Sequence, residues 1–76
     1  EENGRRSLTA VQNLPLELSG ANVLTEMKRK FGCKGAFVQD PSWGQVIHLQ
    51  GDQRHKVGEY LQQADIVSRD VKMDFF

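Results

Sequence analysis

The most informative part of this sequence is a run of nine residues, Val46-Ile47-His48-Leu49-Gln50-Gly51-Asp52-Gln53-Arg54. Val46, Ile47 and Leu49 are apolar whereas His48 and Gln50 are polar, a pattern that indicates a strand with apolar residues on part of both faces. Gly51 ends this strand, and either Gly51 or Asp52 is suited to cap a helix that begins with Gln53 and Arg54 at an exposed corner. The run therefore predicts a strand that leads directly into a helix.

Two stretches carry apolar residues at the spacing of an amphipathic helix. The first predicts a helix over 21–31 that ends before Gly32. The second predicts a helix over 53–64, in which Gly58 costs about 1 kcal/mol relative to alanine. The residues expected on the two buried faces are Leu24, Met27, Phe31, Val57, Tyr60, Leu61 and Ala64.

Alternating apolar residues predict strands over 7–12, 35–39 and 45–50, and a last strand at Val71, Met73 and Phe75. Residues 13–20 are predicted as a loop because Pro15 opposes regular structure. Packing both helices on one face of the sheet is the economical way to bury both apolar faces. We therefore expect an α+β fold, a two-layer α/β sandwich with two helices on one face of a mostly antiparallel sheet of four to five strands.

The N-terminus carries the signal for a fifth strand. Asn3-Gly4 is a strong hairpin-turn dipeptide, because a type I′ turn needs positive φ at both central residues. Only Glu1 and Glu2 precede this turn. We expect residues 1–76 to form a single domain whose first strand is largely missing, in a chain that is processed or truncated since it begins with Glu1 rather than Met.

Size and composition restrict the classes of protein. A chain of 76 residues has room for one small core, and a deep active site would compete with that core for apolar residues. With 38% hydrophobic and 26% charged residues the chain is typical of a soluble globular protein. We expect no membrane span and no signal peptide. The single cysteine, Cys33, favours a reducing compartment such as the cytosol.

A catalytic or metal site would have to use Cys33, His48, His55 and Asp52. The cation of the neighbouring Lys34 is expected to lower the pKa of Cys33, but neither histidine is near Cys33 in the sequence. The spacing of these residues matches no usual ligand pattern. We therefore expect no catalytic residue, no metal and no cofactor, and Cys33 is expected to pack as a small hydrophobic side chain.

The charge distribution is uneven although the net charge is zero. Residues 1–38 carry six basic and four acidic side chains, and residues 39–76 carry four basic and six acidic ones. The segment 27–34, Met-Lys-Arg-Lys-Phe-Gly-Cys-Lys, holds four cations and no anion. This segment is either a solvated helix face or a surface that binds phosphates.

Together with Phe31-Gly32-Cys33-Lys34-Gly35, the nine-residue run resembles the eukaryotic translation initiation factor 1 family. The usual family forms are Phe-x-Cys-x-Gly followed by Val-Ile-x-Leu-Gln-Gly-Asp-Gln-Arg. The resemblance covers nearly the whole chain and implies the same two-layer fold. Two positions depart from the family pattern: Lys34 replaces the more usual Asn, and His48 replaces the Gln that is common before Leu-Gln-Gly.

The resemblance implies a factor that binds the small (40S) ribosomal subunit near the P site, promotes scanning and enforces start-codon fidelity. Its partners would be 40S rRNA, the initiator tRNA nearby and other initiation factors, and it would act in the cytoplasm as a monomer. The implied rRNA contacts are Lys28, Arg29, Lys30 and Lys34. The implied decoding-site and tRNA-proximal residues are Asn3, Gly4, Arg5, Arg6, Asp40, Pro41, Ser42, Trp43 and Gly44. The implied fidelity corner is Gly51, Asp52, Gln53 and Arg54.

The sequence leaves three alternatives open. Trp43 either folds back over the sheet or is presented to a partner from a hairpin tip. Asp52 either caps a helix only or also makes contacts that affect start-codon choice. The chain itself is either such an initiation factor, a related domain of a reinitiation or recycling factor, or a protein-interaction module that uses its acidic C-terminal half.

Overall fold

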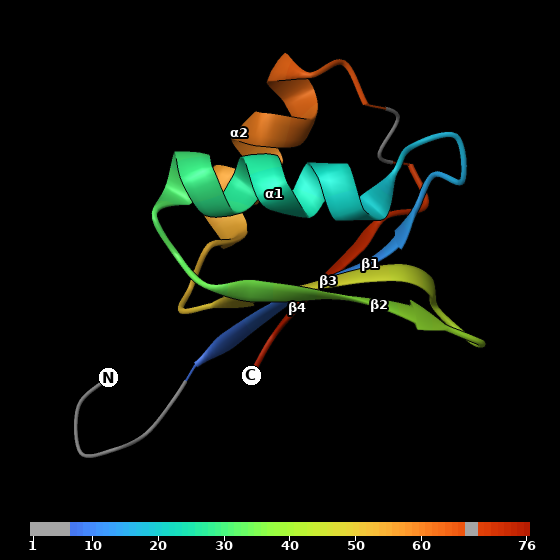
Figure 1. Ribbon diagram of the computed structural model, residues 1–76, viewed down its shortest axis with the longest axis horizontal. Helices are drawn as coiled ribbons and strands as arrows, with labels where there is room; N and C mark the ends of the chain where they lie inside the picture. Colours follow the sequence, from blue (N-terminus) through green and yellow to red (C-terminus); the bar gives the residue numbers. More distant parts are fainter. Residues whose placement is uncertain (1–6, 67–68) are drawn as a thin grey trace.

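Residues 7–66 and 69–76 are described by a computed structural model (Figure 1). Its elements are β1 (Leu8–Leu14), α1 (Gly20–Phe31), β2 (Gly35–Asp40), β3 (Gly44–Gln50), α2 (Arg54–Gln63) and β4 (Lys72–Phe75). The four strands form one sheet in the order β2-β3-β1-β4, and all three neighbouring pairs are antiparallel. Both helices cover the same face of this sheet (Figure 1). The predicted α+β fold is confirmed. The predicted hairpin turn at Asn3-Gly4 and the arginines Arg5 and Arg6 lie outside the described residues.

The core lies between the sheet and the two helices. Alternation along β1 and β3 sends one set of side chains toward the helices and the other set toward the uncovered face of the sheet. The buried core consists of Val11, Leu14, Val23, Met27, Ile47, Leu49, Val57, Tyr60 and Leu61. Ala64, which was predicted to face inward, is exposed because α2 ends at Gln63. Neither helix in the described part of the chain is long and apolar enough to span a membrane.

The first strand is longer than predicted because it contains a β-bulge. The pairing of β1 with β3 shifts register between Val11 and Leu14, and Asn13 adopts a φ of 63°. The bulge returns Leu14 to the core face, where it is 2% exposed. The predicted loop over 13–20 was therefore wrong at Asn13 and Leu14, which belong to β1.

The segment between β1 and α1 is held by a buried glutamine of β3. Gln45 is 6% exposed, and its Oε1 accepts a hydrogen bond of 3.0 Å from the Gly20 backbone N–H. Its Nε2 donates to the backbone carbonyls of Pro15 at 2.8 Å and Leu18 at 3.1 Å. The buried amide thus fixes both the loop and the first residue of α1.

The start of α2 agrees only in part with the prediction that Gly51 or Asp52 caps this helix, because Oδ1 of Asp52 accepts the Arg54 backbone N–H at 3.3 Å but Asp52 does not occupy the N-cap position. The N-cap residue is Gln53, and its side chain makes no capping hydrogen bond. The Gln53 backbone N–H instead donates to Oγ1 of Thr9 at 2.9 Å, and the same hydroxyl donates to the Gly51 carbonyl at 2.7 Å. A buried threonine of β1 therefore shares with Asp52 the contacts that pair the first backbone N–H groups of α2.

Candidate functional site

The last turn of α1 carries three cations, Lys28, Arg29 and Lys30. All three are exposed, whereas Val23 and Met27 on the other side of the helix are buried. Basic side chains at a helix C-terminus interact favourably with the partial negative charge of the helix dipole. Gly32 then ends the helix in the left-handed conformation, with a φ of 63°, so the chain turns toward β2 at this point.

Two more lysines extend this basic turn. Lys34 is exposed just before β2, and Lys56 is exposed in the first turn of α2. Lys30 and Lys56 line one hollow of about 320 Å³ together with Glu59, and the charges of Lys28 and Lys56 both act on the Cys33 thiol. We call Lys28, Arg29, Lys30, Lys34 and Lys56 the basic surface. Sequence reasoning missed Lys56, because packing of the first turn of α2 beside the end of α1 is a tertiary feature.

The cations of the basic surface have no carboxylate partner among the described residues. The ion pairs in this part of the chain join Arg54 to Asp52 at 2.8 Å and His55 to Glu59 at 3.2 Å. Glu26, near the middle of α1, accepts a hydrogen bond from the Tyr60 hydroxyl. The basic surface therefore keeps its charge available for an external anion, and its lysines and arginine are suited to phosphate oxygens.

The corner from Gly51 to Arg54 adjoins the basic surface. Gln50 at the end of β3 donates its backbone N–H to the Lys34 carbonyl at 2.9 Å. Gly51 follows with a φ of 86°, a value that favours glycine. The Gln53 side chain folds back and donates to the Gln50 carbonyl at 2.9 Å. The conformation of the corner is thus fixed by these hydrogen bonds and by the positive φ of Gly51.

Asp52 and Arg54 form a local pair at this corner. The Arg54 guanidinium donates to both carboxylate oxygens of Asp52, at 2.9 and 2.8 Å, and lies 4.3 Å from the centre of the Phe75 ring. These hydrogen bonds to Arg54 hold the pKa of Asp52 below its ordinary value. Asp52 therefore orients Arg54, and its Oδ1 also accepts the Arg54 backbone N–H at 3.3 Å, so the predicted capping contact of Asp52 at the start of α2 is present as well.

The hairpin tip from Asp40 to Gly44 lies apart from the basic surface. Gly35 pairs with Leu49 at one end of the β2–β3 hairpin, and Asp40 pairs with Gly44 at the other. Gly35 and Asp40 are five residue steps apart along the strand, a distance of roughly 17 Å. The sequence-predicted site residues therefore form two groups in the structure: the basic surface with the corner, and the hairpin tip.

The tip is a tight turn built by Asp40 and Gly44. One carboxylate oxygen of Asp40 accepts hydrogen bonds from the backbone N–H groups of Ser42 at 2.8 Å and Trp43 at 2.9 Å. Gly44 has a φ of 70°, as expected of the residue that closes a three-residue hairpin loop. Pro41 and Ser42 are exposed at the turn.

Trp43 is partly covered. The residue is 43% exposed. The Lys72 ammonium of β4 lies 5.0 Å from the centre of the indole ring. Because Lys72 pairs with Gln12 on β1, the indole reaches back toward the far edge of the sheet. Of the two readings of Trp43, the folded-back indole agrees better with this contact, although much of its surface stays accessible.

The residues considered for catalysis do not form a cluster. Cys33 packs against the core, and burial raises its pKa although Lys56 and Lys28 act in the opposite direction. The expectation that a lysine would lower the pKa of Cys33 was wrong, because desolvation of the thiolate has the larger effect. His55 is paired with Glu59 on the surface. Within residues 7–66 and 69–76, no group of three or more His, Cys, Asp or Glu side chains is placed to hold a metal ion.

The fold and the basic surface define a small α+β domain suited to binding a phosphate backbone. Residues 1–67 match the family model described as "Translation initiation factor SUI1". The chain belongs to this family, and the resemblance stated from the sequence motifs is confirmed.

Curated relatives agree with this assignment. The chain is 51% identical over 70 residues to the "Protein translation factor SUI1 homolog" of Zea mays, an alignment that covers 92% of this chain and 61% of the relative. It is 50% identical over 70 residues to "Protein translation factor SUI1 homolog 2" of Arabidopsis thaliana, covering 92% and 62% of the two chains. The chain thus spans about three fifths of the length of these relatives.

Proposed function

We propose that this protein acts in translation initiation by binding the rRNA of the small ribosomal subunit through the basic surface. The observation that carries the proposal is a set of five exposed cations from α1, the turn after it and α2, without a carboxylate partner among the described residues. Contacts to backbone phosphates position a protein on folded RNA without reading its sequence. Family membership supports the same role.

The proposed activity is that of a gatekeeper, without catalysis or a cofactor. The factor binds the open, scanning-competent form of the small subunit more tightly than the closed form, and it leaves when the start codon is paired. A ligand shifts a two-state equilibrium only by the difference between its affinities for the two states. We assign this work to residues 1–76 as one initiation-factor domain, acting as a monomer in the cytoplasm together with other initiation factors.

Two regions of the chain are proposed to sense the closed form. The hairpin tip from Asp40 to Gly44 is proposed to lie near the initiator tRNA and to oppose its accommodation by bulk, with the Arg5–Arg6 turn near the decoding site. The corner from Gly51 to Arg54 is proposed to affect start-codon fidelity. The rigid construction of this corner supports the proposal, because Thr9, Asp52 and Phe75 all fix its geometry.

Binding of the protein to purified 40S subunits, followed by chemical footprinting of the rRNA, tests the docking proposal. We expect saturable binding with protection of rRNA near the P site. Affinity should fall with rising salt as counterions are released from the rRNA, with a slope of log K against log salt near −3.5 to −4.5 if about five phosphates are engaged. Binding without any salt dependence would contradict docking through the basic surface.

A reporter that compares initiation at UUG and AUG codons tests the fidelity corner. Asp52→Asn keeps the shape of the side chain and removes the charge that holds Arg54. We expect a higher UUG/AUG ratio at matched protein level, with 40S affinity close to that of the wild type. The same ratio in Asp52→Asn and wild type would leave Asp52 with a local structural role only.

A further inference from the structure

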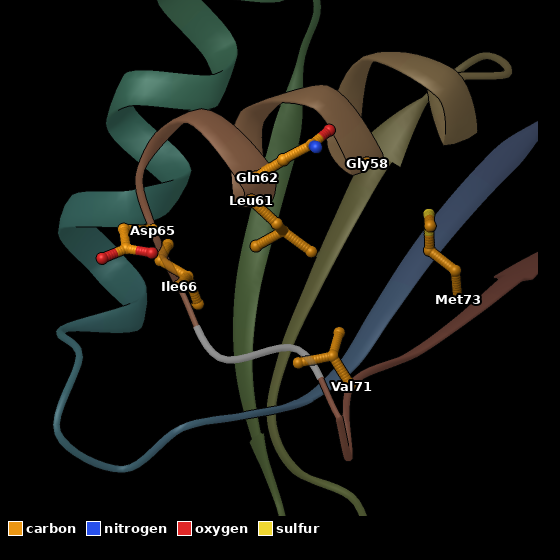
Figure 2. A pocket seen from close by; sticks show the side chains of 7 residues that line it. All are labelled: Gly58, Leu61, Gln62, Asp65, Ile66, Val71 and Met73. Atoms are coloured by element: carbon orange, nitrogen blue, oxygen red, sulfur yellow. The ribbon is translucent and has the colours of Figure 1, made fainter.

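Two adjoining hollows lie near the start of α1, whereas the basic surface lies at the end of this helix. The first, of about 490 Å³, lies between α2 and β4 and has Leu61, Ile66, Val71 and Met73 around it (Figure 2). The second, of about 320 Å³, lies beside the loop before α1 and includes Leu14, Pro15 and Leu16. Val71 lines both hollows, so they adjoin at this residue, and we call the two together the acid-rimmed groove.

The charged side chains that line the groove are all acidic. Glu17 and Asp70 line the second hollow and Asp65 lines the first, and among residues 7–66 and 69–76 no lysine or arginine lines either one. Arg69 precedes Asp70 in the chain without lining the groove. The groove therefore combines an apolar floor with a negative rim.

Leu16 is the most exposed large hydrophobic residue in the described part of the chain, at 83%. Its exposure is fixed by a turn, because the Leu18 N–H donates to the Pro15 carbonyl at 3.1 Å and Gln45 donates to the same carbonyl at 2.8 Å. Leu16 and Glu17 occupy the two central positions of this turn. An apolar side chain and a carboxylate are thus held outward together. Because the turn is already ordered, little conformational entropy would be lost when a partner binds.

We propose that the acid-rimmed groove binds an amphipathic segment of a partner protein that presents apolar side chains on one face and lysine or arginine at its margins. Three carboxylates and no lining cation complement such a segment and repel nucleic acid phosphate. The apolar floor suits anchors spaced along one face of a helix. This surface is separate from the rRNA-binding surface and does not depend on it.

A second copy of this chain fits the groove less well than such a segment. The basic surface of another copy supplies the charge, but the other exposed residues of α1 offer no large apolar anchor, since they are Ala21, Asn22, Thr25 and Glu26. Charge alone would then have to hold the copies together, and exposed ion pairs contribute little by themselves. A partner with an apolar face satisfies both features of the groove.

A synthetic peptide of about 16 residues, with leucines along one helical face and lysines and arginines beside them, serves as the probe. Its fluorescence anisotropy is followed with the full 76-residue chain, and binding is mapped by amide chemical shifts. The control peptide has the same composition in an order without an apolar face. We expect the probe to bind with shifts at Leu16, Asp70 and Val71, and the control peptide to bind at least tenfold more weakly.

Variants of the protein locate the interaction. Glu17→Gln, Asp65→Asn and Asp70→Asn together should weaken probe binding about tenfold, and Leu16→Ala should weaken it roughly threefold to tenfold. Asp70→Asn has a matched control in Asp74→Asn, because Asp74 alternates with Met73 on β4 and lies on the uncovered face of the sheet. Asp74→Asn should change binding less than twofold.

Several outcomes would overturn the proposal. These are equal binding of the two peptides, equal losses in Asp70→Asn and Asp74→Asn, or chemical shifts confined to other surfaces. Self-association in sedimentation that is lost in Leu16→Ala would assign the groove to a second copy, and binding of an RNA oligonucleotide there would assign it to nucleic acid. The triple variant should bind 40S subunits as wild type does. Peptide binding therefore tests the groove proposal, and 40S binding tests the rRNA docking proposal, independently of each other.

Discussion

At the scale of single residues, Thr9 joins β1 to the corner that precedes α2. Its hydroxyl is fully buried, donates to the Gly51 carbonyl and accepts from the Gln53 N–H. Thr9→Val keeps the shape and leaves both backbone groups unpaired, so we expect unfolding free energy to fall by about 1–3 kcal/mol. Thr9→Ser keeps the hydroxyl and should retain most of the stability, as measured by urea unfolding. Equal losses in both variants would show that the methyl group matters and the hydrogen bonds do not.

Tyr60 is the only tyrosine and bridges the two helices through its hydrogen bond to Glu26. Burial and, next, the Glu26 carboxylate raise the pKa of Tyr60 to about 12. The folded-state pKa exceeds the unfolded value of about 10, so this contribution to stability is complete below pH ~10 and is lost as the pH rises toward ~12.

The absorbance of the phenolate measures this pKa directly. We expect Glu26→Gln to move the titration midpoint of Tyr60 downward while leaving it above the value of a free tyrosine, since burial is the larger cause. An unchanged midpoint in Glu26→Gln would mean that the carboxylate does not act on the phenol in solution.

The sequence predicted where some functional residues lie, but it did not predict their contacts with distant elements. The motif around Asp52 identified the corner, but the contact of Arg54 with the Phe75 ring depends on the folding of β4 beside the start of α2. Lys56 was missed for the same kind of reason. Sequence spacing describes neighbours along one element, whereas these contacts join elements far apart in the chain.

At the scale of elements, two glycines in different surroundings give a matched pair of predictions. A Cβ on Gly35 would lie 2.6 Å from the His48 carbonyl oxygen of the neighbouring strand, whereas a Cβ on Gly58 in α2 would meet nothing within 4 Å. Gly35→Ala should therefore destabilise the fold by about 1–3 kcal/mol. Gly58→Ala should stabilise it by about 0.5–1 kcal/mol. Thermal unfolding of both variants against wild type checks the opposite signs, and a stabilising Gly35→Ala would contradict the close packing of β2 on β3.

Element types were predicted well, because long apolar periodicities decide them. The errors lie where tertiary contacts override local signals. Asn13 reads as the start of a loop, yet a bulge lets β1 continue to Leu14. Ala64 continues the helical spacing of α2, yet the helix ends at Gln63. Trp43 could not be placed from its hairpin turn, since Lys72, which contacts it, comes from the last strand.

At the scale of the whole molecule, charge is separated along the helices. The basic surface gathers at the end of α1 and the first turn of α2, and the acid-rimmed groove lies beside the start of α1 and the end of α2. The net charge of zero hides this separation. We infer that one end of the molecule faces rRNA and the other remains accessible to a protein while the factor is bound.

The measurement that tests the central claim is the affinity for purified 40S subunits of two variants with the same net charge. Lys30→Glu with Lys56→Glu changes the basic surface, and Arg69→Glu with Lys72→Glu changes cations outside it. If the basic surface docks on rRNA, the first variant should lose roughly 30-fold or more at physiological salt, and its salt slope should become shallower by about 1.4–1.8. The second should stay within about threefold of wild type. Equal affinities for the two variants would contradict docking through the basic surface.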